Sequence, residues 1–220
     1  MGILPVYFNQ KSSYLWLSIV AGNLLTIWLF RTILINETVF FNTYNELLTF
    51  DRTMQLFGRM KSYAWVSYIS CPVFLFVKFL LVSMVLYVGI IFAGSQYRVK
   101  LGSVLKVVLA SELVFLLATI CKFLWFWFFA GNYTLFDLSF FYPLSLINLF
   151  GTAEIRPVWV YPLQTVNLFH LGYLFLLSSG LTNVCKLKRS ESEKIVLVTY
   201  IPALIFWVTF IMFISVDFTS

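Results

Sequence analysis

The side chains of this sequence that could do chemistry are a few polar residues within long apolar runs. Glu112 is a carboxylate and His170 is the only histidine, and these two residue types hold and transfer protons near neutral pH. Lys78 adds an ammonium group, and Asn167 and Asn23 add amides. An ionised side chain in the middle of a membrane costs at least ~2.5–3.5 kcal/mol, so each one needs a partner, a cavity or a route to the headgroups. These five residues are the candidate intramembrane polar cluster.

The expected depths of these residues suggest how they could meet. Counted at 1.5 Å per residue, Glu112 lies roughly 12 Å from the basic side of the membrane, and His170 lies at the same level. A hydrogen bond or ion pair between the two is therefore allowed. Lys78 lies roughly 21 Å deep, where it could meet an external acid such as Asp137, reach headgroups, or stay buried and neutral. Three interpretations of the cluster stay open: contacts that hold helices together, a pathway for a proton, ion or lipid headgroup, or catalysis.

Sequence motifs for catalysis or metal binding are absent from the chain. It has no Gly-x-Ser-x-Gly elbow, phosphate-binding Gly-rich loop, His-Glu-x-x-His or paired-Cys spacing, and a single histidine cannot supply a histidine-rich metal site. Cys71, Cys121 and Cys185 fit no metal-binding pattern and are expected to be free thiols. We therefore expect no enzyme activity, no cofactor, no metal and no nucleic-acid partner.

The composition indicates the environment in which these residues must be held. The chain of 220 residues is 61% apolar and 11% charged, and its mean hydropathy is +0.91. A soluble domain of this size could not bury so much apolar surface. We expect an all-α integral membrane protein, with residues 1–220 forming one membrane domain.

Five apolar runs are long enough to cross a membrane, which takes about 20 residues of helix. The expected spans are 14–35, 65–92, 104–129, 158–181 and 195–216. Apolar residues at near-helical spacing in segment 38–60 predict an external amphipathic helix, lying in the headgroup layer or packed on the protein itself. Segment 132–156 is apolar but broken by Pro143 and Gly151, so we expect it to be re-entrant or interfacial.

The basic residues indicate an orientation. One set of loops holds eight basic and two acidic residues, and the opposite set holds four basic and six acidic residues. Short loops rich in Lys and Arg stay in the cytoplasm, which places the N-terminus inside and the C-terminus outside, with a bacterial inner membrane as the expected location. The first set of basic residues is Lys11, Arg98, Lys100, Lys106, Lys186, Lys188, Arg189 and Lys194.

Small residues at four-residue spacing mark candidate packing faces. Ser18, Gly22 and Thr26 form such a stripe on the first span, and Gly172 and Gly180 form a less regular one on the fourth. Small side chains let helix backbones approach closely in lipid. The stripes fit contacts within the chain and contacts with another subunit equally well.

Two linkers resemble those of the Yip1-domain family of five-span membrane proteins. The stretch FAGSQYRVKLGSVLKVVLASE resembles the linker between spans two and three of that family, and LLSSGLTNVCKLKRSESEKIVLVTY resembles its basic linker between spans four and five. The resemblance covers roughly residues 66–216, and segment 132–156 is longer than the family pattern. It implies a cytoplasmic N-terminus, no catalytic residues, and a membrane-embedded partner of other proteins, which in eukaryotic members acts in trafficking.

These observations lead to two functional hypotheses. The first is an accessory or scaffold subunit that binds lipids and other integral membrane proteins in a larger complex, linked to protein or lipid trafficking or secretion. The alternative is a small transporter, or a lipid or proton conduit, that uses the Glu112, His170 and Lys78 cluster. Loss of transport in a stably accumulating Glu112 variant would separate the second from the first.

Overall fold

The computed structural model describes residues 8, 10–45, 47–94, 99–150 and 155–217, and over these residues the chain is helical with no β-strand. The expected all-α class is therefore confirmed. Four helices are long and apolar enough to cross a membrane, namely Ser12–Leu34, Ala64–Phe92, Leu101–Phe128 and Arg189–Ser215. They correspond to α2 (Ser12–Leu29) with η1 (Phe30–Leu34), α5 (Ala64–Phe92), α6 (Leu101–Phe128), and α10 (Arg189–Ile195) with η4 (Val196–Tyr200) and α11 (Ile201–Asp217).

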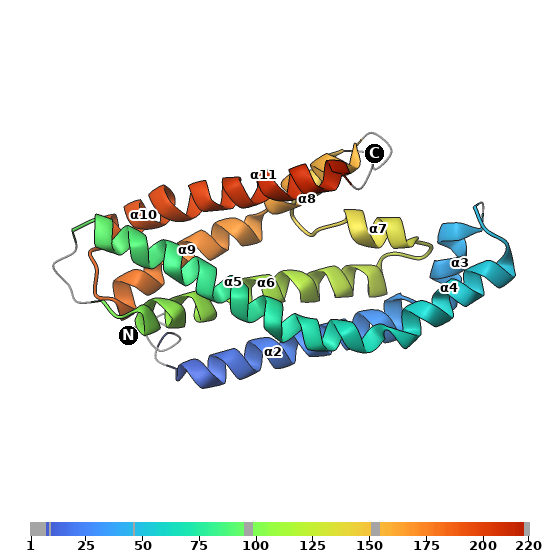
Figure 1. Cartoon of the computed structure of the whole chain (residues 1–220), viewed down its shortest axis with the longest axis horizontal. Coiled ribbons are helices and arrows are strands. Elements are labelled where there is room, and N and C mark those ends of the chain that lie inside the picture. The colour runs from blue at the N-terminus through green and yellow to red at the C-terminus, as the bar shows by residue number, and fades with distance from the viewer. Residues whose placement is uncertain (1–7, 9, 46, 95–98, 151–154, 218–220) are drawn as a thin grey trace.

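These runs form helices because a chain in lipid must satisfy each backbone N–H and C=O within its own segment. α5 has 29 residues, which at 1.5 Å each gives about 43 Å, more than the roughly 30 Å of an average hydrocarbon core. A helix of that length crosses a membrane at a tilt. Figure 1 shows α5 running obliquely across α6, so residues at different heights along the two helices meet.

The expected fourth span, 158–181, is not one continuous helix. It is divided into α8 (Pro157–Thr165) and α9 (Leu168–Val184), with Val166 and Asn167 extended between them. The break is stabilised locally, because the Asn167 side chain accepts a hydrogen bond of 2.7 Å from the backbone N–H of His170 and so caps the start of α9. α9 alone, with 17 residues, is shorter than the four spans.

The expected amphipathic helix over 38–60 is also two helices. α3 (Glu37–Tyr44) and α4 (Phe50–Ser62) are joined by a turn, in which the backbone N–H of Leu48 donates to the carbonyl of Tyr44. The turn lets the buried rings of Phe40 and Phe57 pack with their centroids 5.4 Å apart, a contact that one straight helix cannot make. Burial of apolar surface therefore overrides the continuous helical pattern.

The segment expected to be re-entrant or interfacial folds back onto the break between α8 and α9. It contains α7 (Leu135–Phe140) and the short helix η2 (Leu146–Leu149), and residues 151–154 lie outside the described residues. Leu146 N–H donates to the carbonyl of Val166 and Leu168 N–H donates to that of Leu144, at 3.0 and 3.1 Å. The backbone groups released by the helix break are thus satisfied by this segment, as burial in an apolar medium requires.

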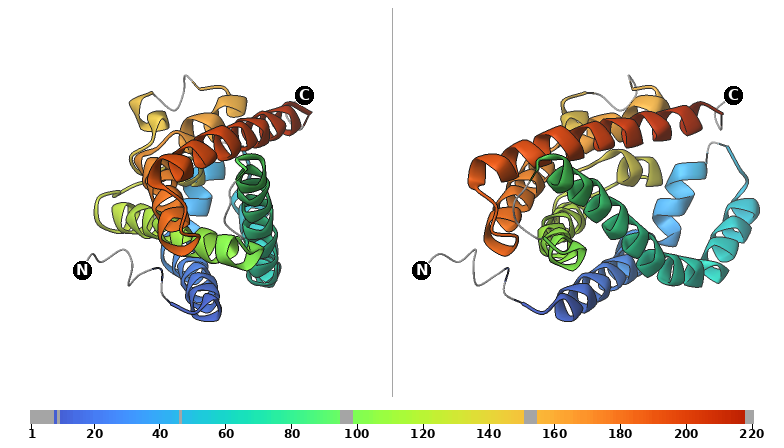
Figure 2. Two further views of the ribbon diagram at one scale, coloured as in Figure 1. Left: turned by 90° about the vertical axis from the view of Figure 1, so that its left-hand side faces the viewer. Right: turned by 60° about the vertical axis from the view of Figure 1, so that its left-hand side comes forward.

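The core surrounds α6, which packs against α2, α5 and α9. Figures 1 and 2 show α6 and α9 side by side, with α2 and α11 on the outside. Buried side chains from these helices form one cluster, whose fully enclosed members include Ile19, Phe79, Leu86, Val107, Tyr173 and Leu177.

The glycines of the predicted packing stripes mark contacts within the chain. A Cβ placed at Gly22 would lie 2.6 Å from a methyl carbon of Leu116 on α6. At Gly180 it would lie 2.4 Å from a methyl carbon of Val107, also on α6. At Gly172 it would lie 3.6 Å from Cγ1 of Val114, which is ordinary contact. Gly22 and Gly180 therefore let α2 and α9 approach α6 closely.

The hydroxyls of the first stripe serve their own helix. Ser18 Oγ donates to the carbonyls of Tyr14 and Leu15, and Thr26 Oγ1 donates to those of Gly22 and Asn23. Such bonds satisfy a polar side chain in an apolar environment without a second helix.

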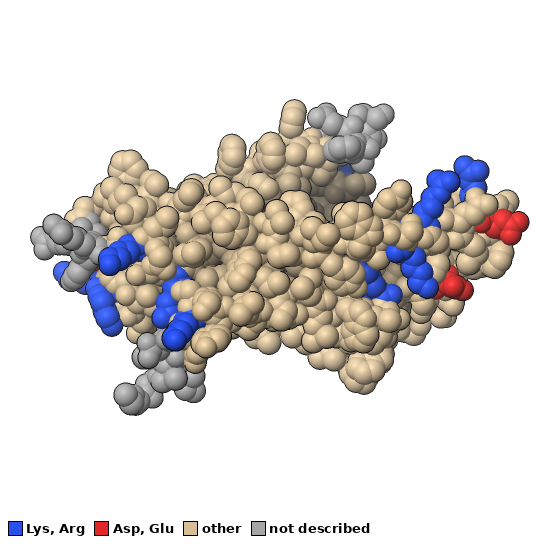
Figure 3. All heavy atoms as spheres, turned by 60° about the horizontal axis from the view of Figure 1, so that its bottom comes forward, with Lys and Arg blue, Asp and Glu red and all other residues tan. Residues whose placement is uncertain are grey.

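Charged side chains gather toward the two ends of the molecule, and the face drawn in Figure 3 is largely uncharged between them. One end holds the start of α2, the start of α6 and the linker between α9 and α10. The other holds α3 and α4. Three residues that enter the expected charge asymmetry, Glu46, Arg98 and Glu154, lie outside the described residues.

Candidate intramembrane site

Lys78 and Glu112 form an ion pair between two of the candidate spans. The Nζ atom of Lys78 on α5 lies 2.5 Å from Oε1 of Glu112 on α6. The Lys78 side chain is 44% exposed, whereas that of Glu112 is 5% exposed. The same Nζ lies 4.7 Å from the centroid of the Phe115 ring, one turn beyond Glu112, in reach of a cation–π contact. The ammonium group is thus held by a carboxylate and an aromatic face.

This partner differs from those considered for Lys78 in the sequence. Asp137 instead completes a capping box with Thr134 at the start of α7. Depths counted along straight helices placed Lys78 and Glu112 roughly 9 Å apart, yet the two side chains touch. The oblique course of α5 across α6 removes that difference in height.

A set of aromatic and imidazole rings adjoins the ion pair. His170 Nε2 on α9 lies 3.0 Å from the hydroxyl of Tyr200 on η4. The Phe115 ring lies 5.3 Å from the His170 ring and 4.8 Å from the Tyr173 ring, and Tyr173 lies 5.5 Å from Tyr200. Phe115 therefore contacts both the Lys78 ammonium and the His170 imidazole. We call Lys78, Glu112, Phe115, His170, Tyr173 and Tyr200 together the polar centre.

Two buried polar atoms of the polar centre have no hydrogen-bond partner among the described residues. They are Oε2 of Glu112 and the hydroxyl oxygen of Tyr173. Glu112 is 4% exposed and Tyr173 is fully buried. An unsatisfied buried polar group costs about 1–3 kcal/mol, and such groups are rare in native proteins. A carboxylate oxygen accepts hydrogen bonds and binds cations, and a tyrosine hydroxyl can donate or accept. The centre therefore offers binding capacity that the ion pair does not use.

The other predicted members of the cluster lie differently. Glu112 pairs with Lys78 and His170 pairs with Tyr200, so the expected contact between Glu112 and His170 is replaced by these two contacts. Asn167 caps α9 one turn before His170. The amide of Asn23 donates to the carbonyl of Ile19 within α2. The structure thus brings Lys78, Glu112 and His170 together and gives the two asparagines roles in their own helices.

Phe115, Tyr173 and Tyr200 belong to the centre but were not among the predicted residues. The spacing carried a signal for two of them, because Phe115 and Tyr173 each follow a predicted residue by three positions and so share its helix face. Tyr200 had no such signal. Its position depends on how η4 packs beside α9, and η4 is a π-helical segment; such segments occur frequently at functional sites.

The segment folded against the helix break carries Tyr142, whose side chain is partly buried. Burial is the main cause that raises the pKa of the Tyr142 phenol to about 12, and the Glu112 carboxylate adds to the shift. The Tyr142 carbonyl accepts hydrogen bonds from Ser145 Oγ and Asn148 Nδ2.

Two pockets are lined by residues outside the polar centre. One, of about 330 Å³, lies between α9 and α10. The other, of about 850 Å³, lies between the end of α6 and the segment that follows it, and is lined largely by aromatic side chains such as Trp125, Phe126, Tyr133 and Phe141. Among the described residues, no group of three or more His, Cys, Asp and Glu side chains is arranged to hold a metal ion, and the three cysteines are free thiols.

Comparison of the chain with protein-family models, with curated proteins and with solved structures finds no match in any of the three.

Proposed function

We propose that this protein is a small five-span transporter or conduit, and that its polar centre binds and passes on a proton or a small cation. Charged side chains within membrane helices are rare and commonly mark ion and proton pathways. The buried Glu112 on α6 pairs with Lys78 on α5, and the Phe115 ring beside this pair also contacts His170 on α9. This convergence supports a site between helices over isolated polar contacts.

The observation that carries the proposal is the unused polar capacity beside the ion pair. A buried pair that only holds helices together is stable when the remaining lone pairs of the carboxylate are also satisfied. Here Oε2 of Glu112 and the hydroxyl of Tyr173 are buried without a partner among the described residues. A proton or cation bound at Oε2 of Glu112 would satisfy this oxygen.

The broken helix supports the same function. We take α8 and α9 together as the remaining span, the fourth in chain order, interrupted at Val166 and Asn167. Interrupted helices near the middle of the membrane are typical of ion and substrate sites in transporters, where irregular backbone is tolerated next to protein or a polar cavity. The break lies one turn before His170, which belongs to the polar centre.

We further propose that the basic end lies in the cytoplasm, with a bacterial inner membrane as the location and segment 132–150 as a re-entrant segment on the outer side. The distribution of Lys and Arg between the loops supports this orientation. A membrane-impermeant maleimide should label Lys188→Cys only after the cells are permeabilised, and Lys61→Cys in intact cells, in a background without the native cysteines. The reverse pattern would overturn the orientation.

Flux measurements test the function. The purified protein is reconstituted into vesicles of phosphatidylcholine and phosphatidylglycerol that contain a pH-sensitive or a cation-sensitive dye, and a membrane potential is imposed. We expect faster proton or cation entry than in empty vesicles, and we expect Glu112→Gln to reduce the rate to that of empty vesicles. Glu37→Gln changes an exposed carboxylate at the start of α3, outside the polar centre, and should leave the rate unchanged.

A further variant separates transport from a structural role. Lys78→Met combined with Glu112→Leu replaces the ion pair by apolar side chains, which often preserves stability. Under our proposal this double variant folds but does not conduct. Conduction at the wild-type rate by the double variant, or no flux of any tested ion by the wild type, would refute the proposal.

A second candidate function is the accessory or scaffold subunit that the Yip1-like linkers imply, with lipids and other integral membrane proteins as partners in trafficking or secretion. It is favoured by the sparse packing of two outer spans. Only 17% of the 18-residue apolar stretch in Ser12–Leu34, and the same share in Arg189–Ser215, is buried inside the protein. Weighing the particle in mild detergent tests it. A monomer without stoichiometric partners would contradict this function and would leave the conduit proposal unaffected.

A further inference from the structure

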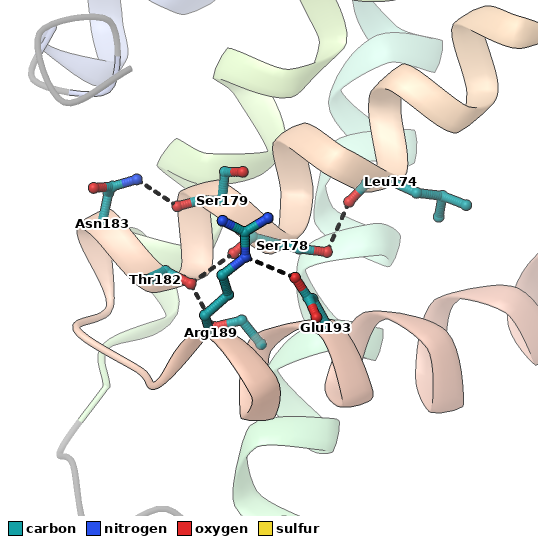
Figure 4. Close-up of polar contacts among 8 residues, drawn as sticks. Leu174, Ser178, Ser179, Thr182, Asn183, Arg189 and Glu193 are labelled. Atoms are coloured by element: carbon teal, nitrogen blue, oxygen red, sulfur yellow. Dashed lines mark hydrogen bonds and ion pairs between the residues drawn. The ribbon is translucent and has the colours of Figure 1, made fainter. Parts of the chain in front are cut away.

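The pocket between α9 and α10 extends from the basic end of the molecule to Leu174, the residue that follows Tyr173 of the polar centre. It has a volume of about 330 Å³. Figure 4 shows Arg189 and Glu193 of α10 facing the last two turns of α9 across it. Its lining includes Leu174, Ser178, Asn183, Arg189, Val196 and Leu197.

The pocket has a polar mouth and an apolar floor. Asn183 and Arg189 stand where α9 ends and α10 begins, at the end of the molecule. Leu174 lies more than two turns further into α9, and Val196 and Leu197 lie two turns into the neighbouring helix. α9 ends at the basic end and α10 begins there, so both helices extend from that end into the bundle (Figure 1). Leu174, Val196 and Leu197 therefore occupy the inner side of the pocket.

The helices that form the pocket are fixed to one another at its mouth. Thr182 Oγ1 lies 3.0 Å from Ser192 Oγ on α10, and Ser192 is fully buried. Ser178 Oγ and Asn183 Nδ2 donate to carbonyls of α9, at 2.9 and 2.8 Å. The bond between Thr182 and Ser192 thus joins the two helices at the mouth.

Arg189 supplies the charge for a ligand. Its Nε donates a hydrogen bond of 2.9 Å to Oε1 of Glu193, and within the described part of the chain its two Nη groups have no hydrogen-bond partner in the structure. In Figure 4 the guanidinium group of Arg189 is drawn beside Ser178 and Ser179 of α9. The Arg189 side chain is 75% exposed, so the four N–H donors of its two Nη groups are accessible at the mouth of the pocket, and their planar arrangement suits a phosphate group.

We propose that this pocket binds the headgroup of an anionic phospholipid. The phosphate accepts hydrogen bonds from the Nη groups of Arg189, and an acyl chain follows Leu174 and Leu197 into the membrane. Lys186, Lys188 and Lys194 lie in the same linker and helix, so the mouth attracts anions in spite of Glu191 and Glu193. Basic pockets between membrane helices at the interface are known to take anionic headgroups. Free phosphate would leave the apolar half of the pocket unused.

The test measures lipid binding to the purified full chain in neutral detergent. Phosphatidylglycerol is titrated while the thermal unfolding temperature is recorded, with phosphatidylcholine and inorganic phosphate titrated in parallel. We expect stabilisation by phosphatidylglycerol, and we expect Arg189→Gln to weaken its apparent affinity about tenfold or more, the loss expected for charge-assisted hydrogen bonds. Lys100→Gln removes an exposed basic residue at the same end, outside the pocket, and should keep the wild-type affinity.

A second variant covers the case in which Arg189→Gln folds poorly. Ser178→Leu fills the pocket from its α9 side without changing the charge, and it should abolish the effect of phosphatidylglycerol. Equal losses in Arg189→Gln and Lys100→Gln would show diffuse surface charge and overturn the proposal. Equal stabilisation by inorganic phosphate or by phosphatidylcholine would overturn it as well. None of these outcomes depends on flux through the polar centre.

Discussion

Lys78 and Glu112 are 34 positions apart in the sequence and 2.5 Å apart in the structure, and only one of them is buried. Glu112 is enclosed by the bundle, whereas the Lys78 side chain leaves almost half of its surface exposed. The carboxylate is therefore the fixed partner, and the ammonium group, on a flexible chain of four methylenes, is the movable one. A partner that can move away leaves Glu112 free to bind another cation.

Removal of the movable partner should destabilise the protein. Lys78→Met leaves the Glu112 carboxylate buried and unpaired, and we expect it to lower the free energy of unfolding by about 3 kcal/mol, the lower end of the range for a broken buried pair because Lys78 is partly exposed. Lys78→Met combined with Glu112→Leu should recover most of that loss. Thermal unfolding in detergent measures both. If the two substitutions destabilise additively, the side chains are not coupled.

A close contact between α5 and η4 should make Gly89 intolerant of substitution. A Cβ at Gly89 would lie 2.4 Å from Cγ2 of Thr199, so Gly89→Ala forces the helices apart, and we expect a loss of about 1–3 kcal/mol. Gly58→Ala is the matched control, because nothing lies within 4 Å of a Cβ there in α4, and it should stabilise the helix by about 0.5–1 kcal/mol. A shift in the same direction for both variants would argue against this packing.

The helix break should depend on the amide of Asn167. Asn167→Ala removes the cap on His170 N–H and the hydrogen bonds that the amide donates to the carbonyls of Gln164 and Thr165. We expect a loss of about 1–2 kcal/mol, as for other N-caps. Asn167→Ser retains a capping oxygen and should lose less. Hydrogen exchange at the start of α9 gives a local readout, and unchanged exchange in Asn167→Ala would exclude the capping role.

Cys185, at the end of α9, should react slowly with thiol reagents. Burial raises the pKa of its thiol to about 11, above the ordinary value near 8.5. Because only the thiolate reacts, a raised pKa means less reactive species at pH 8, and the alkylation rate should rise about tenfold per pH unit until pH approaches 11. The measurement uses a variant without Cys71 and Cys121. Lys188→Cys in a background without the three native cysteines is the exposed control, and the alkylation rate of this thiol should level off at lower pH. Equal rates at pH 8 would show that Cys185 is not protected.

The sequence by itself determined the environment of the chain and the positions of its long helices. An apolar content of 61% leaves lipid as the only solvent for most of the surface, and the four long helices lie within a few residues of the predicted spans because their length is set by the thickness of the membrane. The polar residues Lys78, Glu112 and His170 also stood out from the sequence, since charge is costly in lipid wherever the helices lie.

The tertiary structure alone decided which of these residues meet. The tilt of α5 pairs Lys78 with Glu112, and a count along straight helices cannot supply that tilt because it arises from packing against α6. The division of 158–181 into α8 and α9 has the same origin. The break at Val166 and Asn167 contains neither glycine nor proline. The extended backbone there is stable because the segment around Leu144 and Leu146, about 20 residues earlier, supplies the missing hydrogen bonds. Contacts between distant segments are decided by the whole fold.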